Sequence, residues 1–226
     1  MFAKKIEFNA NKTSEIVKPN QLGVQALEQL SLKELLPFID WSPFFRSWDL
    51  HGKYPAILND EIVGEQASQL FDDAQEMIKK IIAKQLLKAK AVFGLFEANS
   101  INDDDISIQK SGNEIAVFRT LRQQLKKREG IPNLALADFV APKEIVKTDY
   151  VGAFCTAIFG AQELAESYRA KEDDYNGIMV QAIADRFAEA FAEYLHKQVR
   201  IKHWGYTANE ELTNEDLIKE NYKGIR

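Results

Sequence analysis

The sequence predicts an α+β fold, in which long amphipathic helices pack around a central, mainly antiparallel sheet. Two apolar runs are typical of strands, a turn sequence between them indicates a β-hairpin, and a long helical pattern precedes and follows this region. Strands grouped in the middle of a chain, with helices on either side, favour α+β. The 226 residues, 46% of them hydrophobic, suffice for the core of one large domain.

The beginning of the chain is expected to be a tether, residues 1–21, ahead of a single domain spanning 22–226. The tether is rich in Lys, Asn, Thr and Ser and poor in apolar residues, a composition that suits a linker. Ser31 can N-cap a short helical segment over 32–36, which Pro37 helps to end.

Two long helices are predicted from apolar residues that recur every three or four positions. The first is expected to start near Asn59, and the second to run from about Asp173 to Ile201. The apolar positions of the first helix are Val63, Ala67, Leu70, Ala74, Met77, Ile78 and Ile81. Those of the second form a ridge made of Met179, Ile183, Phe187, Phe191, Leu195 and Val199.

The strand region lies between these helices. The runs 91–96 and 150–159 are apolar without strict alternation, which predicts strands covered on both faces. Between them, 105–109 and 114–118 flank the turn sequence Ser-Gly-Asn at 111–113, which predicts a β-hairpin.

Composition excludes several classes of function. A net charge of -5 without a long basic stripe argues against nucleic-acid binding. No stretch reaches the ~20 apolar residues of a membrane span, and no signal peptide opens the chain, so we expect a cytoplasmic protein. The single cysteine, Cys155, excludes an internal disulfide, and its apolar neighbours predict a buried, inert thiol.

Metal and nucleotide motifs are missing from the sequence. His51, His196 and His203 are scattered, and no H-E-x-x-H or Cys/His cluster occurs, so no metal site is expected. A G-x-G-x-x-G or P-loop sequence is also absent, which disfavours Rossmann-type and P-loop nucleotide sites.

Five segments carry distinctive combinations of aromatic, glycine and charged residues. They are Phe38-Ile39-Asp40-Trp41-Ser42-Pro43-Phe44-Phe45, Gly52-Lys53-Tyr54-Pro55, Leu136-Ala137-Asp138-Phe139-Val140-Ala141-Pro142, the run around Ala184-Asp185-Arg186, and the final stretch from Trp204 to Arg226. In these segments the chain resembles the activation domain of cobalamin-dependent methionine synthase. The resemblance covers about residue 22 to the last residue.

The resemblance implies a methyltransferase module in methionine biosynthesis. Such a module binds S-adenosylmethionine for the reductive remethylation of cob(II)alamin, while the cobalamin itself is held by another module. The implied partners are that cobalamin-binding module and flavodoxin or an equivalent reductase. The contribution of the protein would be to place the methyl donor, which is a proximity effect. The isolated chain is expected to have no methionine synthase turnover.

The resemblance also implies three S-adenosylmethionine-binding residues, Asp40, Glu189 and Arg226, and no catalytic side chain. On the residues alone, Asp40 equally suits a cap or turn before Ser42-Pro43. On periodicity alone, the position of Glu189 favours a solvated helix face over a binding site, because it lies opposite the apolar ridge in a row with Asp185 and Glu193.

Arg226 is the last residue of the chain, and in the family the matching arginine opens a ligand-binding loop. We therefore expect a partial site, truncated at its C-terminal end. The alternative is a docking module for the cobalamin domain and flavodoxin that does not bind S-adenosylmethionine in this form.

Three expectations concern the stretch that leads to Arg226. Thr213 is expected to cap a helix with Asp216 at its third position. Trp204 and Tyr206 favour packing over ligand stacking. The basic residues Lys197, Arg200 and Lys202 suit a solvated helix end or a contact with an acidic partner.

Overall fold

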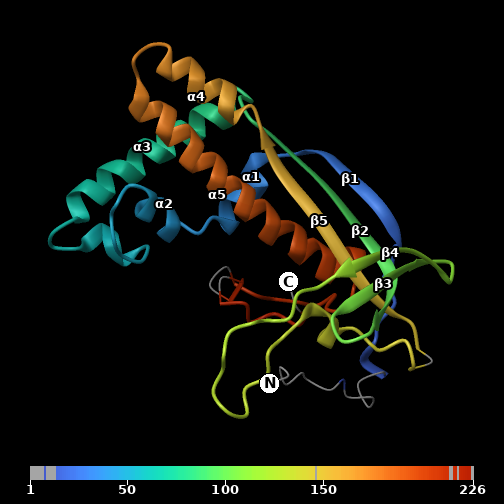
Figure 1. The fold of residues 1–226 in the computed structure, drawn as a ribbon. Coiled ribbons are helices and arrows are strands. Elements are labelled where there is room, and N and C mark those ends of the chain that lie inside the picture. Colours follow the sequence, from blue (N-terminus) through green and yellow to red (C-terminus); the bar gives the residue numbers. More distant parts are fainter. Residues whose placement is uncertain (1–7, 9–13, 146, 214–215, 218, 225–226) are drawn as a thin grey trace. The chain divides into compact units, whose positions relative to one another are not determined.

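A computed structural model describes residues 8, 14–145, 147–213, 216–217 and 219–224 (Figure 1). Its described strands form one five-stranded sheet in the order β1-β2-β3-β4, with β5 also paired to β2. The strands are β1 (Gly23–Leu30), β2 (Lys88–Ile101), β3 (Asp105–Lys110), β4 (Asn113–Arg119) and β5 (Asp149–Phe159). The helices are α1 (Leu32–Leu35), α2 (Ser42–Ser47), α3 (Gly64–Ala83), α4 (Ala161–Arg169) and α5 (Asp174–Gln198). The predicted α+β class is confirmed.

The chain divides into two compact units. Unit 1 comprises Met1–Gln25, Phe93–Phe154 and Val199–Ala208, and unit 2 comprises Ala26–Val92, Cys155–Gln198 and Asn209–Arg226. All five helices belong to unit 2, and the β3–β4 hairpin belongs to unit 1. Among the described helices, none combines the length and apolar character needed to span a bilayer.

The two long helices of unit 2 bury the apolar faces that their periodicity predicts. In α3, six of the seven predicted positions are buried: Ala67, Leu70, Ala74, Met77, Ile78 and Ile81. In α5, Met179, Ile183, Phe187, Phe191 and Leu195 are at most 1% exposed. Both amphipathic patterns are confirmed.

The predicted start of the first long helix is wrong by several residues. A 3₁₀ turn covers Ala56–Asn59, and α3 begins only at Gly64. Between them the Asp60 carboxylate accepts hydrogen bonds from the backbone N–H groups of Ile62 (2.9 Å) and Val63 (3.0 Å). These bonds hold the backbone in a turn ahead of the helix and lower the pKa of Asp60, the bond from Val63 most strongly.

The end of the second long helix also differs from the prediction. After Gln198 the chain forms a π-helical turn, Val199–His203. A π turn has an extra residue per turn, which shifts the side chains after Val199 around the helix axis. Arg200 is consequently fully buried, so its placement in a solvated basic cluster was wrong.

Strand β2 follows the prediction and β5 does not. Residues 91–96 of β2 are buried or half-buried apart from Val92, which is 43% exposed. In β5 the stretch 152–155 is exposed, including the free thiol of Cys155, which was predicted to be buried. An apolar run without alternation cannot by periodicity alone distinguish a covered strand from an uncovered one.

The predicted hairpin is confirmed in unit 1. β3 and β4 pair antiparallel from Asp105 with Arg119 to Lys110 with Asn113, with an irregularity between Ile108 and Gln109. Ser111 (φ 53°) and Gly112 (φ 79°) supply the left-handed backbone that a tight hairpin turn requires.

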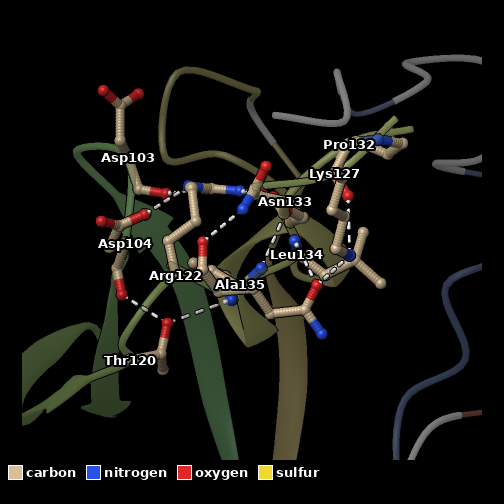
Figure 2. A network of polar contacts seen from close by, with 12 residues as sticks. Asp103, Asp104, Thr120, Arg122, Lys127, Pro132, Asn133, Leu134 and Ala135 are labelled. Atoms are coloured by element: carbon tan, nitrogen blue, oxygen red, sulfur yellow. Dashed lines mark hydrogen bonds and ion pairs between the residues drawn. The ribbon is translucent and has the colours of Figure 1, made fainter. Parts of the chain in front are cut away.

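One buried arginine, Arg122, organises the segment that follows β4 in unit 1 (Figure 2). Its two terminal nitrogens donate to the two carboxylate oxygens of Asp138, each at 2.7 Å, and its Nε donates to Asp104 at 2.9 Å. The backbone carbonyls of Asn133 and Asp103 accept the remaining bonds, both at 2.7 Å. All five guanidinium donors are therefore used, and the pKa of Arg122 is raised, chiefly by its hydrogen bonds to Asp138.

The described part of the predicted tether contacts the segment that follows α5. The Trp204 indole donates to the Val17 carbonyl at 2.8 Å, and the Asn20 side chain donates to the Lys202 carbonyl at 2.9 Å. Trp204 also packs edge-to-face on Tyr206, with ring centroids 5.4 Å apart, so the two aromatics pack together as predicted. The division into 1–21 and 22–226 stays a prediction.

Gly160→Ala is expected to lower the free energy of unfolding by at least about 2 kcal/mol. Gly160 joins β5 to α4 at φ 93°, and an added Cβ would lie 2.8 Å from the Leu86 carbonyl oxygen. Gly112→Ala is the matched control, because it has a similar φ of 79° but open space around the new Cβ. Urea unfolding of both variants should show the larger loss for Gly160→Ala, and equal losses would contradict this prediction.

Candidate functional site

Asp40 lies in unit 2 between the 3₁₀ turn Leu36–Phe38 and α2. Its Oδ1 accepts a hydrogen bond from the backbone N–H of Ser42 at 2.9 Å, which forms an Asx turn at the start of α2. The turn role considered for Asp40 is therefore confirmed. Its Oδ2 has no hydrogen bond to any described residue, so the half-buried carboxylate keeps one oxygen for another donor.

The backbone around Asp40 is supported by a cluster of aromatic rings. Trp41 packs edge-to-face on Phe44 (5.3 Å between centroids) and on Phe71 of α3 (4.9 Å). Tyr54, from the Gly-Lys-Tyr-Pro segment, lies 5.4 Å from Phe71. The cluster therefore packs the start of α2, directly after Asp40, against α3.

Glu189 lies on α5, also in unit 2. Its side chain is 67% exposed, as expected opposite the apolar ridge. Both carboxylate oxygens accept from Arg186, one helical turn earlier, at 3.0 and 3.1 Å. Such an exposed pair adds little to stability, about 0 to 1 kcal/mol, so Glu189 can exchange its partner at small cost. Arg186 is a neighbour that the sequence analysis did not assign to the site.

The elements that carry Asp40 and Glu189 contact each other within unit 2. Phe38, two residues before Asp40, packs edge-to-face on Tyr194 of α5 with centroids 5.6 Å apart. The Tyr194 hydroxyl donates to Glu34 at 3.2 Å, and the Lys197 ammonium lies 5.8 Å from the centre of the Phe38 ring. Burial, followed by the nearby Glu34 charge, raises the pKa of Tyr194. These contacts fix the segment of Asp40 against the helix of Glu189.

The two carboxylates do not line the hollow found in unit 2. That hollow, of about 520 Å³, is lined by residues at the ends of β1 and α3 and at the start of β2, and includes neither Asp40 nor Glu189. Asp40 is instead half-buried just before α2, and Glu189 is exposed on α5. Within the described ranges, no group of three or more His, Cys, Asp or Glu residues could hold a metal ion.

The third predicted site residue, Arg226, lies outside the described residues. The predicted cap before it is confirmed, because the Thr213 hydroxyl accepts from the Asp216 N–H at 3.2 Å and Asp216 accepts from the Thr213 N–H at 3.1 Å. The hydrogen bonds from Thr213 lower the pKa of Asp216, the side-chain bond most strongly. These reciprocal bonds form a capping box between Thr213 and Asp216.

The family of the chain follows from its match to known proteins. The family model for the activation domain of vitamin B12-dependent methionine synthase matches residues 31–226. The chain belongs to this family. The activation domain also shares 48% sequence identity, at a TM-score of 0.91, with a crystal structure of the MetH reactivation domain bound to AdoHcy. The match covers 99% of this chain and 69% of that one, which confirms both the resemblance and the fold class.

Proposed function

We propose that this activation domain binds S-adenosylmethionine and presents its methyl group for the reductive remethylation of cob(II)alamin. The observation that carries the proposal is the similarity to the MetH reactivation domain, which is described as bound to AdoHcy. S-adenosylhomocysteine is what remains of S-adenosylmethionine after its methyl group has left. A protein 48% identical over nearly the whole chain supports a ligand of the same chemistry here.

The described residues fit the positive end of such a ligand. S-adenosylmethionine carries an ammonium and a sulfonium cation, and a carboxylate with a free oxygen can accept a charge-assisted hydrogen bond from the ammonium. Asp40 supplies that oxygen, and its Asx turn to Ser42 keeps the carboxylate oriented. Glu189 would supply a second negative charge on α5, where its carboxylate pairs with Arg186.

The remaining roles are proposed from the family resemblance. Arg226 would pair with the carboxylate of the ligand, as a planar guanidinium suits bidentate contact. Cobalamin, held by another module, would supply the cobalt that accepts the methyl group once a flavodoxin-type donor has supplied one electron. This chain would act by placing the methyl donor, a contribution from proximity and orientation.

Asp40→Asn is expected to weaken S-adenosylmethionine binding about tenfold, equivalent to ~1.4 kcal/mol, because it removes the charge of the acceptor. The asparagine retains a side-chain oxygen for the Ser42 N–H, so the turn should survive, whereas Asp40→Ala removes both. Asp72→Ala, on the exposed side of α3, is the control for loss of one acidic charge. Calorimetric titration measures the three affinities.

The same titration separates the proposed function from a docking module. An affinity of Asp40→Asn equal to that of the parent chain would remove Asp40 from the site. Lack of binding by the parent chain would leave docking of the cobalamin module as the function.

A further inference from the structure

The hollow of about 520 Å³ in unit 2 has the size of a small-molecule site. Ligand sites in proteins measure roughly 300 to 1,000 Å³ and combine an apolar lining with a few polar groups. All residues that line the hollow lie between positions 29 and 89, so it belongs to unit 2 alone. The proposed S-adenosylmethionine site uses none of them, which leaves the hollow open to a ligand of its own.

The floor of the hollow is apolar and supported by the core of unit 2. Leu32 of α1, Ile81 of α3 and Leu87 just before β2 line it and are at most 6% exposed. Ile82 also lines the hollow and is half-buried, so its side chain is partly accessible to a ligand. The floor can therefore bury the apolar part of a ligand.

The backbone at the end of α3, beside this floor, is closed by its own hydrogen bonds. The Leu86 N–H donates to the Ile81 carbonyl at 3.0 Å, and the Gln85 N–H donates to the Ile82 carbonyl at 3.3 Å. Gln85 has a φ of 51°, the left-handed conformation that ends many helices. Because these carbonyls have donors, the hollow presents side chains to a ligand rather than the open, negative end of a helix.

The rim of the hollow carries positive charge. Lys33 and Lys88 line it, and no Asp or Glu among the described residues does. Neither ammonium forms an ion pair or hydrogen bond with a described residue. The Ser31 hydroxyl, also at the rim, accepts from the Lys33 N–H at 3.3 Å and keeps its own proton for donation. Two cations and a hydroxyl without a neighbouring carboxylate suit an anionic group.

We propose that the hollow binds a small organic anion, in which an acidic group is attached to an apolar body. The Lys33 and Lys88 ammonium groups pair with the acidic group, the Ser31 hydroxyl donates to it, and the apolar body lies on the floor. A cationic ligand would meet two like charges. A neutral apolar ligand could use the floor but would gain nothing from the lysines, so the charge of the ligand is the property to test.

Fluorescence titration with anilinonaphthalene sulfonate tests the proposal, and N-phenylnaphthylamine is the matched probe without the sulfonate. Lys33→Gln/Lys88→Gln should weaken sulfonate binding about tenfold and change binding of the neutral probe less than about twofold. Ile82→Ser removes part of the floor and should weaken both probes. Lys79→Gln/Lys171→Gln removes two exposed lysines elsewhere in unit 2 and should leave both affinities unaltered. Thermal unfolding confirms that each variant is folded.

Competition defines the body of the ligand. Octanoate has an aliphatic body and naphthoate an aromatic one, and displacement of the sulfonate by either acid supports the proposal. Four results would overturn it: no saturable sulfonate binding by the parent chain, equal sulfonate affinity of Lys33→Gln/Lys88→Gln and the parent chain, an equal loss of both probes in that variant, or no displacement by either acid.

A parallel titration with S-adenosylhomocysteine keeps the proposed function separate. All hollow variants should bind it as the parent chain does, and displacement of the sulfonate by S-adenosylhomocysteine would overturn the assignment of the hollow to a different ligand. If the parent chain binds the sulfonate through Lys33 and Lys88 but does not bind S-adenosylhomocysteine, the proposed function fails and the anion site stands.

Discussion

Arg122→Met is expected to lower the free energy of unfolding by about 3 to 5 kcal/mol, the range for breaking one side of a buried ion pair. The side chains of Arg122 and Asp138 are 7% and 2% exposed, and they share two hydrogen bonds of 2.7 Å. Without the guanidinium, the Asp138 carboxylate stays buried with its charge uncompensated. The carbonyls of Asn133 and Asp103 also lose their donor.

Two companion variants identify the cause of that loss. Arg122→Met/Asp138→Asn should recover part of the stability, because the second change removes the uncompensated charge. Arg119→Met should cost less than about 1 kcal/mol, since the Arg119 side chain is 75% exposed and pairs with Asp105 at the surface. Guanidinium unfolding gives all three values. A loss below about 1 kcal/mol for Arg122→Met would show that the buried pair does not stabilise unit 1.

Phe191→Ala is expected to cost about 3 to 5 kcal/mol, as truncation of a buried phenylalanine leaves a cavity. Phe191 is fully buried in the apolar ridge of α5, and its ring lies 6.5 Å from that of Tyr194. Tyr194 in turn contacts Phe38, two residues before Asp40. The cavity should therefore also weaken the packing of the Asp40 segment on α5.

Phe159→Ala is the matched control for Phe191→Ala. Phe159 ends β5 and is 53% exposed, so its loss should cost less than about 1 kcal/mol. Chemical unfolding of the two variants should differ by at least about 2 kcal/mol. Similar values for both would place the α5 ridge outside the core of unit 2.

Local periodicity predicted the parts of the fold that depend on neighbouring residues. The α5 ridge, the buried face of α3 and the β3–β4 hairpin each repeat a pattern within one element, and each is confirmed. The predictions that failed concern the burial of single side chains, which depends on contacts with distant parts of the chain. Cys155 is exposed because no described segment covers that part of β5, and Arg200 is buried because a π turn follows α5.

In the candidate site, too, only contacts between residues close in sequence could be predicted. Asp40 could be assigned to a turn from its neighbours Ser42 and Pro43, and the structure confirms that hydrogen bond. The pairing of Glu189 with Arg186 could have been found, since the residues are three positions apart on one helix. The bond between Arg122 and Asp138 joins distant positions, and periodicity gave no signal for it. Asp138 lies in a segment that resembles the family. Its carboxylate accepts hydrogen bonds from Arg122 and from the Ala135 N–H, and these bonds stabilise the segment after β4.

The central claim is that S-adenosyl ligands bind at the surface carrying Asp40 and Glu189. Amide NMR spectra of the chain titrated with S-adenosylhomocysteine test it most directly, because they locate the ligand without reference to activity. The account predicts saturable shifts at Asp40, at Ser42 and along α5 around Glu189, with residues 121–136 after β4 unaffected. Saturable shifts confined to other residues, or no shifts at millimolar ligand, would contradict it.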